Sequence, residues 1–311
     1  MKKYQQLIDQ QTWAFINKTY ACYPENTVTL SLIEQRAIYD TMCAEFFAGY
    51  PAGVSARDEA IRAVDHAIPV RHYASAQPDQ RAQILYFHGG GFVVGGLHSH
   101  DDVCAEFCAA TGFSLTSVDY RLAPEHVYPA ALEDALTAYD AVCAQSEPAI
   151  ILAGDSAGGT LAAQVAHARR RAPRPPLAQL LIYPWLGNGF DRASYREHAE
   201  APMLTTADVK AYGKLLFADN SSETPQPWAA PLDDQDFSDL PPTYLFTAQC
   251  DPLCDDGADY HRQLQAAGIA SQYVCEPGLV HGYLRARHSV QRAADSVARM
   301  VTALRAAGQR A

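Results

Sequence analysis

Six short apolar runs alternate with helix-forming stretches along the chain, and this alternation restricts the possible folds more than any other feature. Several of the intervening stretches are rich in alanine, as at 130–144 and 157–171. Short apolar runs separated by helices predict parallel strands in a sheet that helices cover on both faces. The expected strands are 83–87, 113–118, 149–153, 179–183, 243–247 and 272–275. The sequence therefore predicts an α/β fold with a mostly parallel central sheet.

Two segments depart from this alternation. The first sixty residues have the pattern of helices, and Ser31 with Glu34 three positions later is a capping-box signature. About sixty residues separate the fourth expected strand from the fifth, and Thr205 with Asp208 marks a helix start within them. A structureless loop of that length is unusual in a compact domain. We therefore expect a helical insertion over the sheet.

Composition excludes several classes of protein. The 311 residues are 48% hydrophobic and 19% charged, which is typical of a globular chain. The formal net charge of −11 argues against a nucleic-acid partner, because such partners are bound by Lys and Arg that neutralise phosphates. No stretch reaches the ~18 consecutive apolar residues of a membrane span, and residues 4–11 lack the apolar core of a signal peptide. We expect a cytoplasmic protein without a membrane span, and no pattern indicates its oligomeric state.

Eight cysteines raise the question of a metal site. Cys104 and Cys108 lie near His98 and His100, but the CxxC spacing of structural zinc sites is absent. A chain of this length needs no disulfides to stabilise a small core. We therefore expect buried free thiols, no bound metal and no cofactor.

The expected strand at 149–153 leads directly into the pentapeptide GDSAG (154–158), a match to G-x-S-x-G. The pentapeptide alone is a weak signal, and a glycine turn with a helix-capping serine is its structural alternative. A strand before it and a helix from Ala157 onward are the context of a nucleophile elbow, a strained turn that exposes a serine. This context favours Ser156 as a nucleophile at a helix N-terminus, where N–H groups face developing negative charge.

A second glycine cluster, HGGGF (88–92), follows the first expected strand. In lipases and esterases such a loop forms part of the oxyanion hole, together with the N–H of the residue after the nucleophile. The alternative is a dinucleotide-binding loop built on Gly89, Gly91 and Gly95. Their spacing misses G-x-G-x-x-G, and no acidic residue about 20 positions later fills the expected role. The cluster therefore predicts stabilisation of an oxyanion.

A catalytic serine needs a base, and the base needs an acid to orient it; in this arrangement the order along the chain is Ser, Asp or Glu, then His. Asp251 follows the fifth expected strand, at the sheet edge where active sites of open α/β sheets collect. His281 follows the sixth. Their competitors are expected at the start of a helix or within one, and they are Asp255, Asp256, His261 and His288. Asp251 and His281 are therefore the expected acid and base.

These motifs together resemble the hormone-sensitive-lipase-like esterases, and within them the bacterial acetyl esterases. The resemblance covers roughly residues 60–311 and is carried by HGGGF (88–92), DYRLAPEH (119–126), PAALED (129–134), GDSAGG (154–159) and DPL (251–253). It implies the α/β-hydrolase fold, with a catalytic domain at 61–311 and a helical cap made of residues 1–60 and an insertion at about 186–225. It implies the following site: Ser156 as nucleophile, Asp251 as acid, His281 as base, and the N–H groups of Gly90, Gly91 and Ala157 as oxyanion hole.

The expected function is hydrolysis of short-chain carboxylic esters through an acyl-enzyme intermediate, with a small-molecule ester as the substrate. An amidase, deacetylase or peptidase could use the same three residues. A non-catalytic ligand-binding or regulatory protein on this fold would be expected to have lost one of them. The cap is the part of the chain that matches the family least, so it leaves the size of the substrate open.

Overall fold

The computed structural model describes residues 2–145, 147–218 and 230–311. In this part of the chain, eight strands form one sheet in the order β1-β2-β4-β3-β5-β6-β7-β8. Neighbouring strands from β4 to β8 are parallel, while β2 is antiparallel to β1 and β4. The strands are β1 (Val54–Arg62), β2 (Ala67–Ser75), β3 (Ala82–Phe87), β4 (Ser114–Val118), β5 (Ala149–Asp155), β6 (Ala178–Ile182), β7 (Thr243–Cys250) and β8 (Ser271–Val280). The predicted α/β fold with a mostly parallel sheet is confirmed.

All six predicted strands are present, as β3 to β8, and the structure adds β1 and β2. These two escaped prediction because β1 is exposed along most of its length, with only Ile61 buried, so it shows no apolar run. Pro69 interrupts β2, where it stands opposite Ala60 of the edge strand. A proline is tolerated beside an edge and weakens the sequence pattern of a strand. The sheet thus begins at Val54, within the segment that was expected to be helical.

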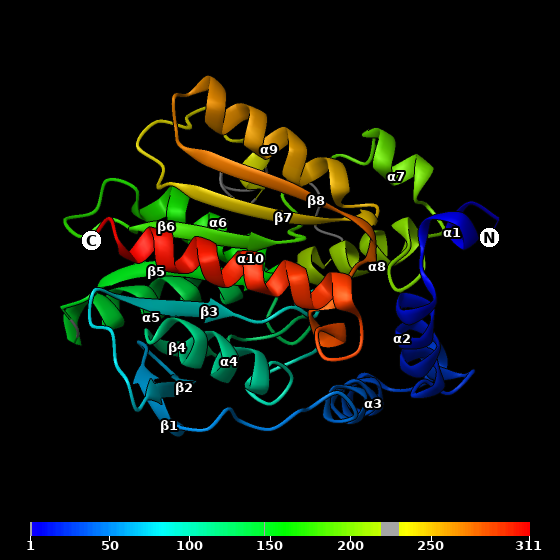
Figure 1. The fold of residues 1–311 in the computed structure, drawn as a ribbon, viewed down its shortest axis with the longest axis horizontal. Coiled ribbons are helices and arrows are strands. Elements are labelled where there is room, and N and C mark those ends of the chain that lie inside the picture. The colour runs from blue at the N-terminus through cyan, green and yellow to red at the C-terminus, as the bar shows by residue number, and fades with distance from the viewer. Residues whose placement is uncertain (1, 146, 219–229) are drawn as a thin grey trace.

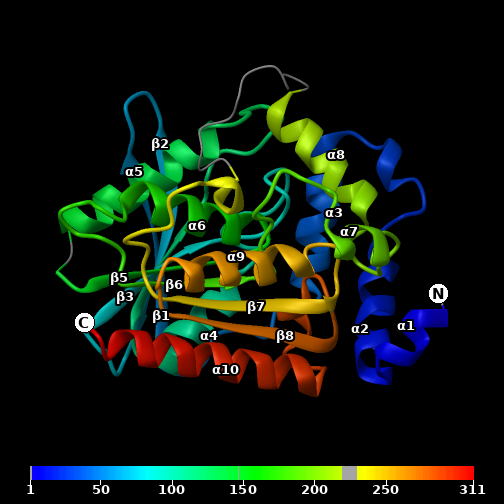
Figure 2. The same cartoon turned by 90° about the horizontal axis from the view of Figure 1, so that it is seen from above.

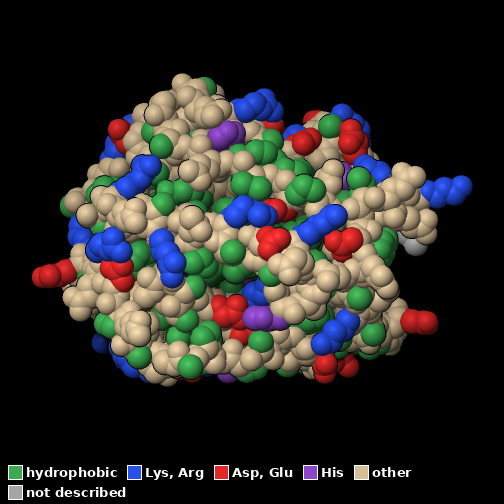
Figure 3. Space-filling model, viewed as in Figure 1, with side chains coloured by type: hydrophobic (Ala, Val, Ile, Leu, Met, Phe, Trp, Pro, Cys, Tyr) green, Lys and Arg blue, Asp and Glu red, His purple; other side chains and the backbone are tan. Residues whose placement is uncertain are grey.

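Helices cover both faces of the sheet (Figure 2). Successive residues of β3 pack alternately on the two faces of the sheet. Ile84 and Tyr86 belong to the core that contains α4 and α10. Leu85 and Phe87 belong to the core that contains α5, α6 and α9. On the face seen in Figure 3, Lys and Arg side chains are interspersed with Asp and Glu. The layer helices are α4 (Asp101–Thr111), α5 (Ala130–Gln145), α6 (Ala157–Arg169), α9 (Cys254–Ala266) and α10 (Gln291–Gly308).

A second group of helices lies beyond the carboxyl ends of the parallel strands (Figure 1). They are α1 (Lys2–Leu7), α2 (Gln10–Ala21), α3 (Leu32–Ala44), α7 (Ala193–Glu197) and α8 (Thr206–Phe217). The predicted capping boxes begin α3, at Ser31, and α8, at Thr205. Part of the predicted insertion, 219–225, lies outside the described residues. Among the helices of the described residues, none combines the length and apolarity needed to cross a membrane.

Candidate active site

Ser156 occupies a sharp turn between β5 and α6. Its φ is 53° and its ψ −122°, a left-handed conformation that is costly for a residue with a side chain. The turn is possible because glycines lie two positions before and after the serine: a Cβ on Gly154 would lie 2.3 Å from the carbonyl oxygen of Gly158, and one on Gly158 would lie 1.9 Å from that of Phe87. The predicted strand–turn–helix around Ser156 is therefore present.

The structure brings Ser156, His281 and Asp251 into one hydrogen-bonded chain. His281 Nε2 lies 2.9 Å from Ser156 Oγ, and His281 Nδ1 lies 2.7 Å from Asp251 Oδ2. Asp251 directly follows β7, is fully buried, and accepts a second hydrogen bond from the N–H of Leu253 at 2.9 Å. These contacts fix the orientation of the imidazole, with one ring nitrogen toward the acid and the other toward the serine.

His281 lies closer to its strand than the sequence pattern indicated, because β8 continues to Val280. Asp255 and Asp256 lie in the first turn of α9 and His261 lies within it, as predicted. The placement of His288 in the final helix was wrong: it lies in the turn between the short 3₁₀ helix η4 (Tyr283–Ala286) and α10.

The glycine loop after β3 contains two candidate donors for an oxyanion. The N–H groups of Gly90 and Gly91 donate to no acceptor in the described part of the protein. Both glycines have positive φ, 129° and 62°, and a Cβ on Gly90 would lie 2.0 Å from the carbonyl oxygen of Val94. Ala157 begins α6, and the first N–H groups of a helix have no partner within it. Donors left unpaired beside a serine can bind an oxyanion.

His88, the first residue of this loop, has a structural position. It is fully buried and stacks on Tyr120 with ring centroids 4.3 Å apart, and the Tyr120 hydroxyl donates to the His88 carbonyl oxygen at 2.6 Å. Burial, together with the nearby His100, lowers the pKa of His88 to about 4. The imidazole is therefore neutral at physiological pH, and it adds no charge beneath the loop.

Asp155, beside the serine, connects the two motifs and was missed as a functional residue in the sequence. Its Oδ1 accepts hydrogen bonds from the Gly89 N–H at 2.9 Å and the Tyr86 hydroxyl at 2.8 Å, while Oδ2 faces His100 at 3.3 Å. Burial alone would raise the pKa of Asp155, but His100 and Tyr86 hold it well below its usual range. A buried ionised carboxylate thus ties the glycine loop to the serine turn. The sequence feature that could have indicated this role is the acidic residue inside the GDSAG motif.

Helices of the second group cover this site. A Cβ on Gly91 would lie 2.6 Å from the ring of Tyr212, so α8 packs directly on the glycine loop. From α3, Tyr39 accepts a hydrogen bond from Arg285 of η4. No motif in the sequence indicated a role for Tyr39, Tyr212 or Arg285. Tyr39 and Tyr212 lie in helices whose sequences match the family poorly.

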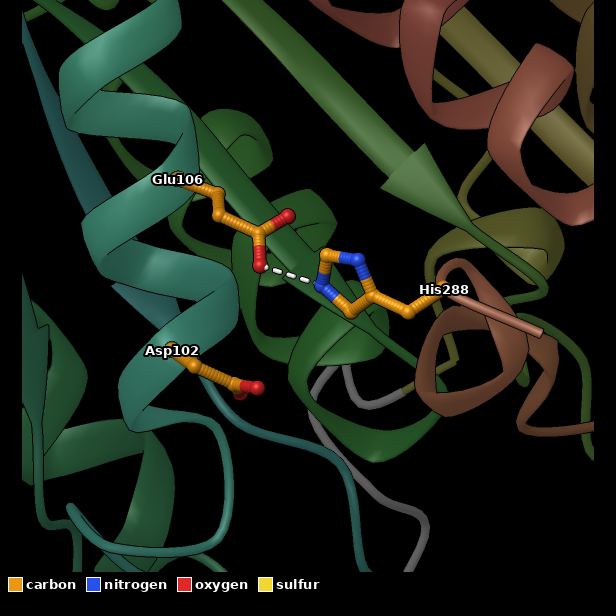
Figure 4. Close-up of side chains that lie close together, drawn as sticks. All are labelled: Asp102, Glu106 and His288. Atoms are coloured by element: carbon orange, nitrogen blue, oxygen red, sulfur yellow. Dashed lines mark hydrogen bonds and ion pairs between the residues drawn. The ribbon is translucent and has the colours of Figure 1, made fainter. Parts of the chain in front are cut away.

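The side chains considered for zinc are not brought together. His98 lies 3.5 Å from Arg71, His100 faces Asp155, and burial raises the pKa of Cys104 and Cys108. The described residues do bring together Asp102, Glu106 and His288 (Figure 4). The Arg287 guanidinium already pairs with both of these carboxylates, at 2.6 and 2.7 Å, so we interpret the cluster as a charge-balanced anchor for the segment after η4.

Comparisons with known proteins agree with this geometry. A sequence profile of a family with the α/β-hydrolase fold matches residues 84–285. Esterase LipI of Mycobacterium tuberculosis (strain ATCC 25618 / H37Rv) is 40% identical over 237 residues, which are 73% of this chain and 74% of LipI. Ethyl acetate hydrolase of Pseudomonas putida is 33% identical over 250 residues, 77% and 78% of the two chains. The structure of a bacterial heroin esterase matches with a TM-score of 0.88 and 28% identity, over 97% of this chain and 98% of that one.

The profile covers well over half of the chain, and the relatives align with most of it. Family and reaction class follow from the motifs, the fold and these matches together. The chain therefore belongs to the hormone-sensitive-lipase-like esterases of the α/β-hydrolase fold and is a carboxylic-ester hydrolase.

Proposed function

We propose that Ser156, His281 and Asp251 hydrolyse short-chain carboxylic esters by two-step acyl transfer. His281 accepts the Ser156 hydroxyl proton as Oγ attacks the ester carbonyl, and Asp251 stabilises the imidazolium that forms. His281 then gives the proton to the departing alcohol. Water repeats the sequence and releases the acid. The observation that carries this proposal is the chain of contacts at 2.9 and 2.7 Å that ends on a serine in a left-handed turn.

The N–H groups of Gly90, Gly91 and Ala157 would bind the oxyanion in both steps. Their support is that the Gly90 and Gly91 donors are unpaired in the described residues and that Asp155 holds the loop against the elbow. Donors that are oriented before the reaction begins stabilise the transition state more than the substrate.

The helices α1, α2, α3, α7 and α8 would act as a cap over the catalytic domain, whose sheet begins at Val54 rather than at residue 61. An apolar pocket between α6 and α8 supports a short acyl chain, because Phe92 and Leu161 line it close to the glycine loop and the serine turn. Trp185 and Leu216 also line it.

We also propose that the protein acts in the cytoplasm, because all eight of its cysteines are free. Free thiols persist in reducing compartments, whereas secreted proteins commonly pair theirs. Fractionation of cells that express the protein, followed by detection in the soluble and membrane fractions, tests this location.

The nucleophile is tested with Ser156→Ala and with a fluorophosphonate probe. The variant should lose about 10⁴-fold or more in kcat/KM for p-nitrophenyl acetate, and the probe should label Ser156 in the wild type. Ser114→Ala is the matched control, because Ser114 is exposed at the start of β4. Esterase activity that survives in Ser156→Ala would overturn the assignment.

The acyl preference is tested with p-nitrophenyl esters from two to sixteen carbons. We expect kcat/KM to be highest at the short end, because longer chains exceed the pocket. A maximum at twelve carbons or beyond would contradict the short-chain proposal and leave the nucleophile assignment intact.

A further inference from the structure

Arg285 lies four residues after His281 and turns back toward it. A Cβ on Gly282, the residue next to His281, would lie 3.3 Å from Arg285 Nη1. On its other side the guanidinium contacts α3: its Cζ lies 5.1 Å from the centroid of the Tyr39 ring, and Nη2 donates to the Tyr39 hydroxyl. The positive charge therefore lies between the proposed base and the helices above it.

This cation has no carboxylate partner among the described residues. Its Nε is buried and donates to no acceptor there. Arg287, two positions on, is buried and pairs with Asp102 and Glu106. A charge removed from water is costly unless an opposite charge and hydrogen bonds compensate it. Arg287 receives that compensation from two ion pairs, whereas Arg285 forms no ion pair among the described residues.

The tyrosines and the thiol around Arg285 carry no negative charge. Burial raises the pKa values of Tyr23, Tyr39 and Tyr212, so these phenols are neutral at physiological pH. Burial likewise raises the pKa of the Cys43 thiol. Asp155 interacts with Arg285 electrostatically. The hydrogen bonds of Asp155 are formed with Tyr86, Gly89 and His100, beneath the serine turn. The guanidinium thus contacts neutral groups such as the Tyr39 hydroxyl, and the ionised Asp155 acts on it without an ion pair among the described residues.

The surroundings of Arg285 extend over the reacting groups. Tyr212, which interacts with it electrostatically, packs on Gly91 of the glycine loop. Tyr183, which also interacts with it, lies 4.7 Å from the His281 ring between centroids. Tyr212 and Tyr183 thus contact two parts of the proposed site, the glycine loop and the base. Arg285 therefore lies within electrostatic reach of side chains that contact the glycine loop and the proposed base.

We propose that Arg285 binds a carboxylate carried by the substrate, so that the enzyme prefers esters with a free carboxylate to neutral esters of the same shape. This inference rests on the proposed function, because it places the anion relative to the proposed triad. A guanidinium binds a carboxylate through two parallel hydrogen bonds, and the low-dielectric surroundings strengthen them. The tyrosine hydroxyls around it can accept or donate the remaining hydrogen bonds.

Two series of substrates test the proposal and locate the carboxylate. Monoethyl esters of succinic, glutaric and adipic acids carry it on the acyl side, and acetate esters of glycolic and 4-hydroxybutyric acids carry it on the alcohol side. Each is compared with its neutral carboxamide by titrating released acid at constant pH. We expect the carboxylate to exceed the carboxamide in kcat/KM by about ten- to a hundredfold in one series.

Arg285→Gln should reduce this ratio to about one, and Arg285→Lys should retain part of it, because lysine keeps the charge but loses the planar fork. Arg262→Gln is the matched control: Arg262 is an exposed arginine of α9 that pairs with Asp259, and its loss should leave the ratio unchanged. The proposal is overturned if neither series favours the carboxylate in the wild type, or if the preference survives in Arg285→Gln.

Inhibition of the wild type gives a readout that does not depend on the folding of a variant. The monoamides of succinic, glutaric and adipic acids, which keep one carboxylate, should inhibit competitively at lower concentration than the corresponding uncharged diamides, and equal inhibition contradicts the proposal. Failure here is distinguishable from failure of the proposed function. If only Arg285 is misassigned, fluorophosphonate still labels Ser156 and neutral esters are still hydrolysed.

Discussion

Gly158 gives a sharp test of how the serine turn and the glycine loop are held together. A Cβ at this position would lie 1.9 Å from the carbonyl oxygen of Phe87, 2.5 Å from its carbonyl carbon and 2.6 Å from the carbonyl oxygen of His88. These are backbone atoms at the end of β3 and the start of the glycine loop. Gly158→Ala therefore forces α6 and that backbone apart by about 1.5 Å, if ordinary contact is taken as 3.4 Å.

The cost has two parts. The interior is close-packed, and Phe87 is paired in register with Gly154 of β5, so the separation strains the sheet as well as the helix. Overpacking of this kind costs about 1–3 kcal/mol of stability. The same displacement moves the Gly90 and Gly91 donors relative to Ser156, and an error of about 1 Å in catalytic geometry costs about 10²-fold in rate. The loss should lie mainly in kcat, because an oxyanion forms only after attack.

The assay is kcat and KM for p-nitrophenyl acetate together with the melting temperature. Gly189→Ala is the matched control, since the nearest atom to its added Cβ, on Arg192, lies at 3.8 Å. We expect the control to match the wild type. A Gly158→Ala enzyme with wild-type melting temperature and kcat/KM within about threefold of wild type would refute this account of the site.

Three further changes test the electrostatics of the structure. Burial raises the pKa of Asp256 to about 7, so between about pH 4 and 7 the folded chain holds a proton that the unfolded chain has lost, and stability falls as pH rises. Asp256→Asn should remove this decline. The prediction is contradicted if the melting temperatures of variant and wild type change in parallel from pH 5 to 8. Asp155→Asn weakens the hydrogen bond from Gly89, and kcat should fall about tenfold with KM little changed; an unchanged kcat argues against the anchor. Asp251→Asn should cost about 10³- to 10⁴-fold in kcat while fluorophosphonate labelling of Ser156 slows in parallel, and normal labelling would exclude Asp251 as the orienting acid.

Local patterns predicted the central sheet because its strands are buried on both faces. Every residue of β3 and β6 is buried, so each appears in the sequence as an apolar run with a single polar residue, Gln83 or Gln179. The edge strand β1 has solvent on its exposed positions, and its sequence is therefore that of a surface segment. His288 was misplaced for a related reason. The short helix η4 lies just before the final helix, which begins at Gln291, and a helical pattern alone does not show where one ends and the other begins.

The sequence by itself determined the fold and the motifs of the candidate site, because strand, turn and helix signals are local and the order of Ser156, Asp251 and His281 follows the order of the strands that present them. Only the tertiary structure decided what surrounds those residues. The role of Asp155 as an anchor, the packing of Tyr212 on the glycine loop and the contact of Arg285 with Tyr39 depend on contacts between segments far apart in the chain. No local pattern records such contacts, because burial and missing partners are properties of the packed molecule.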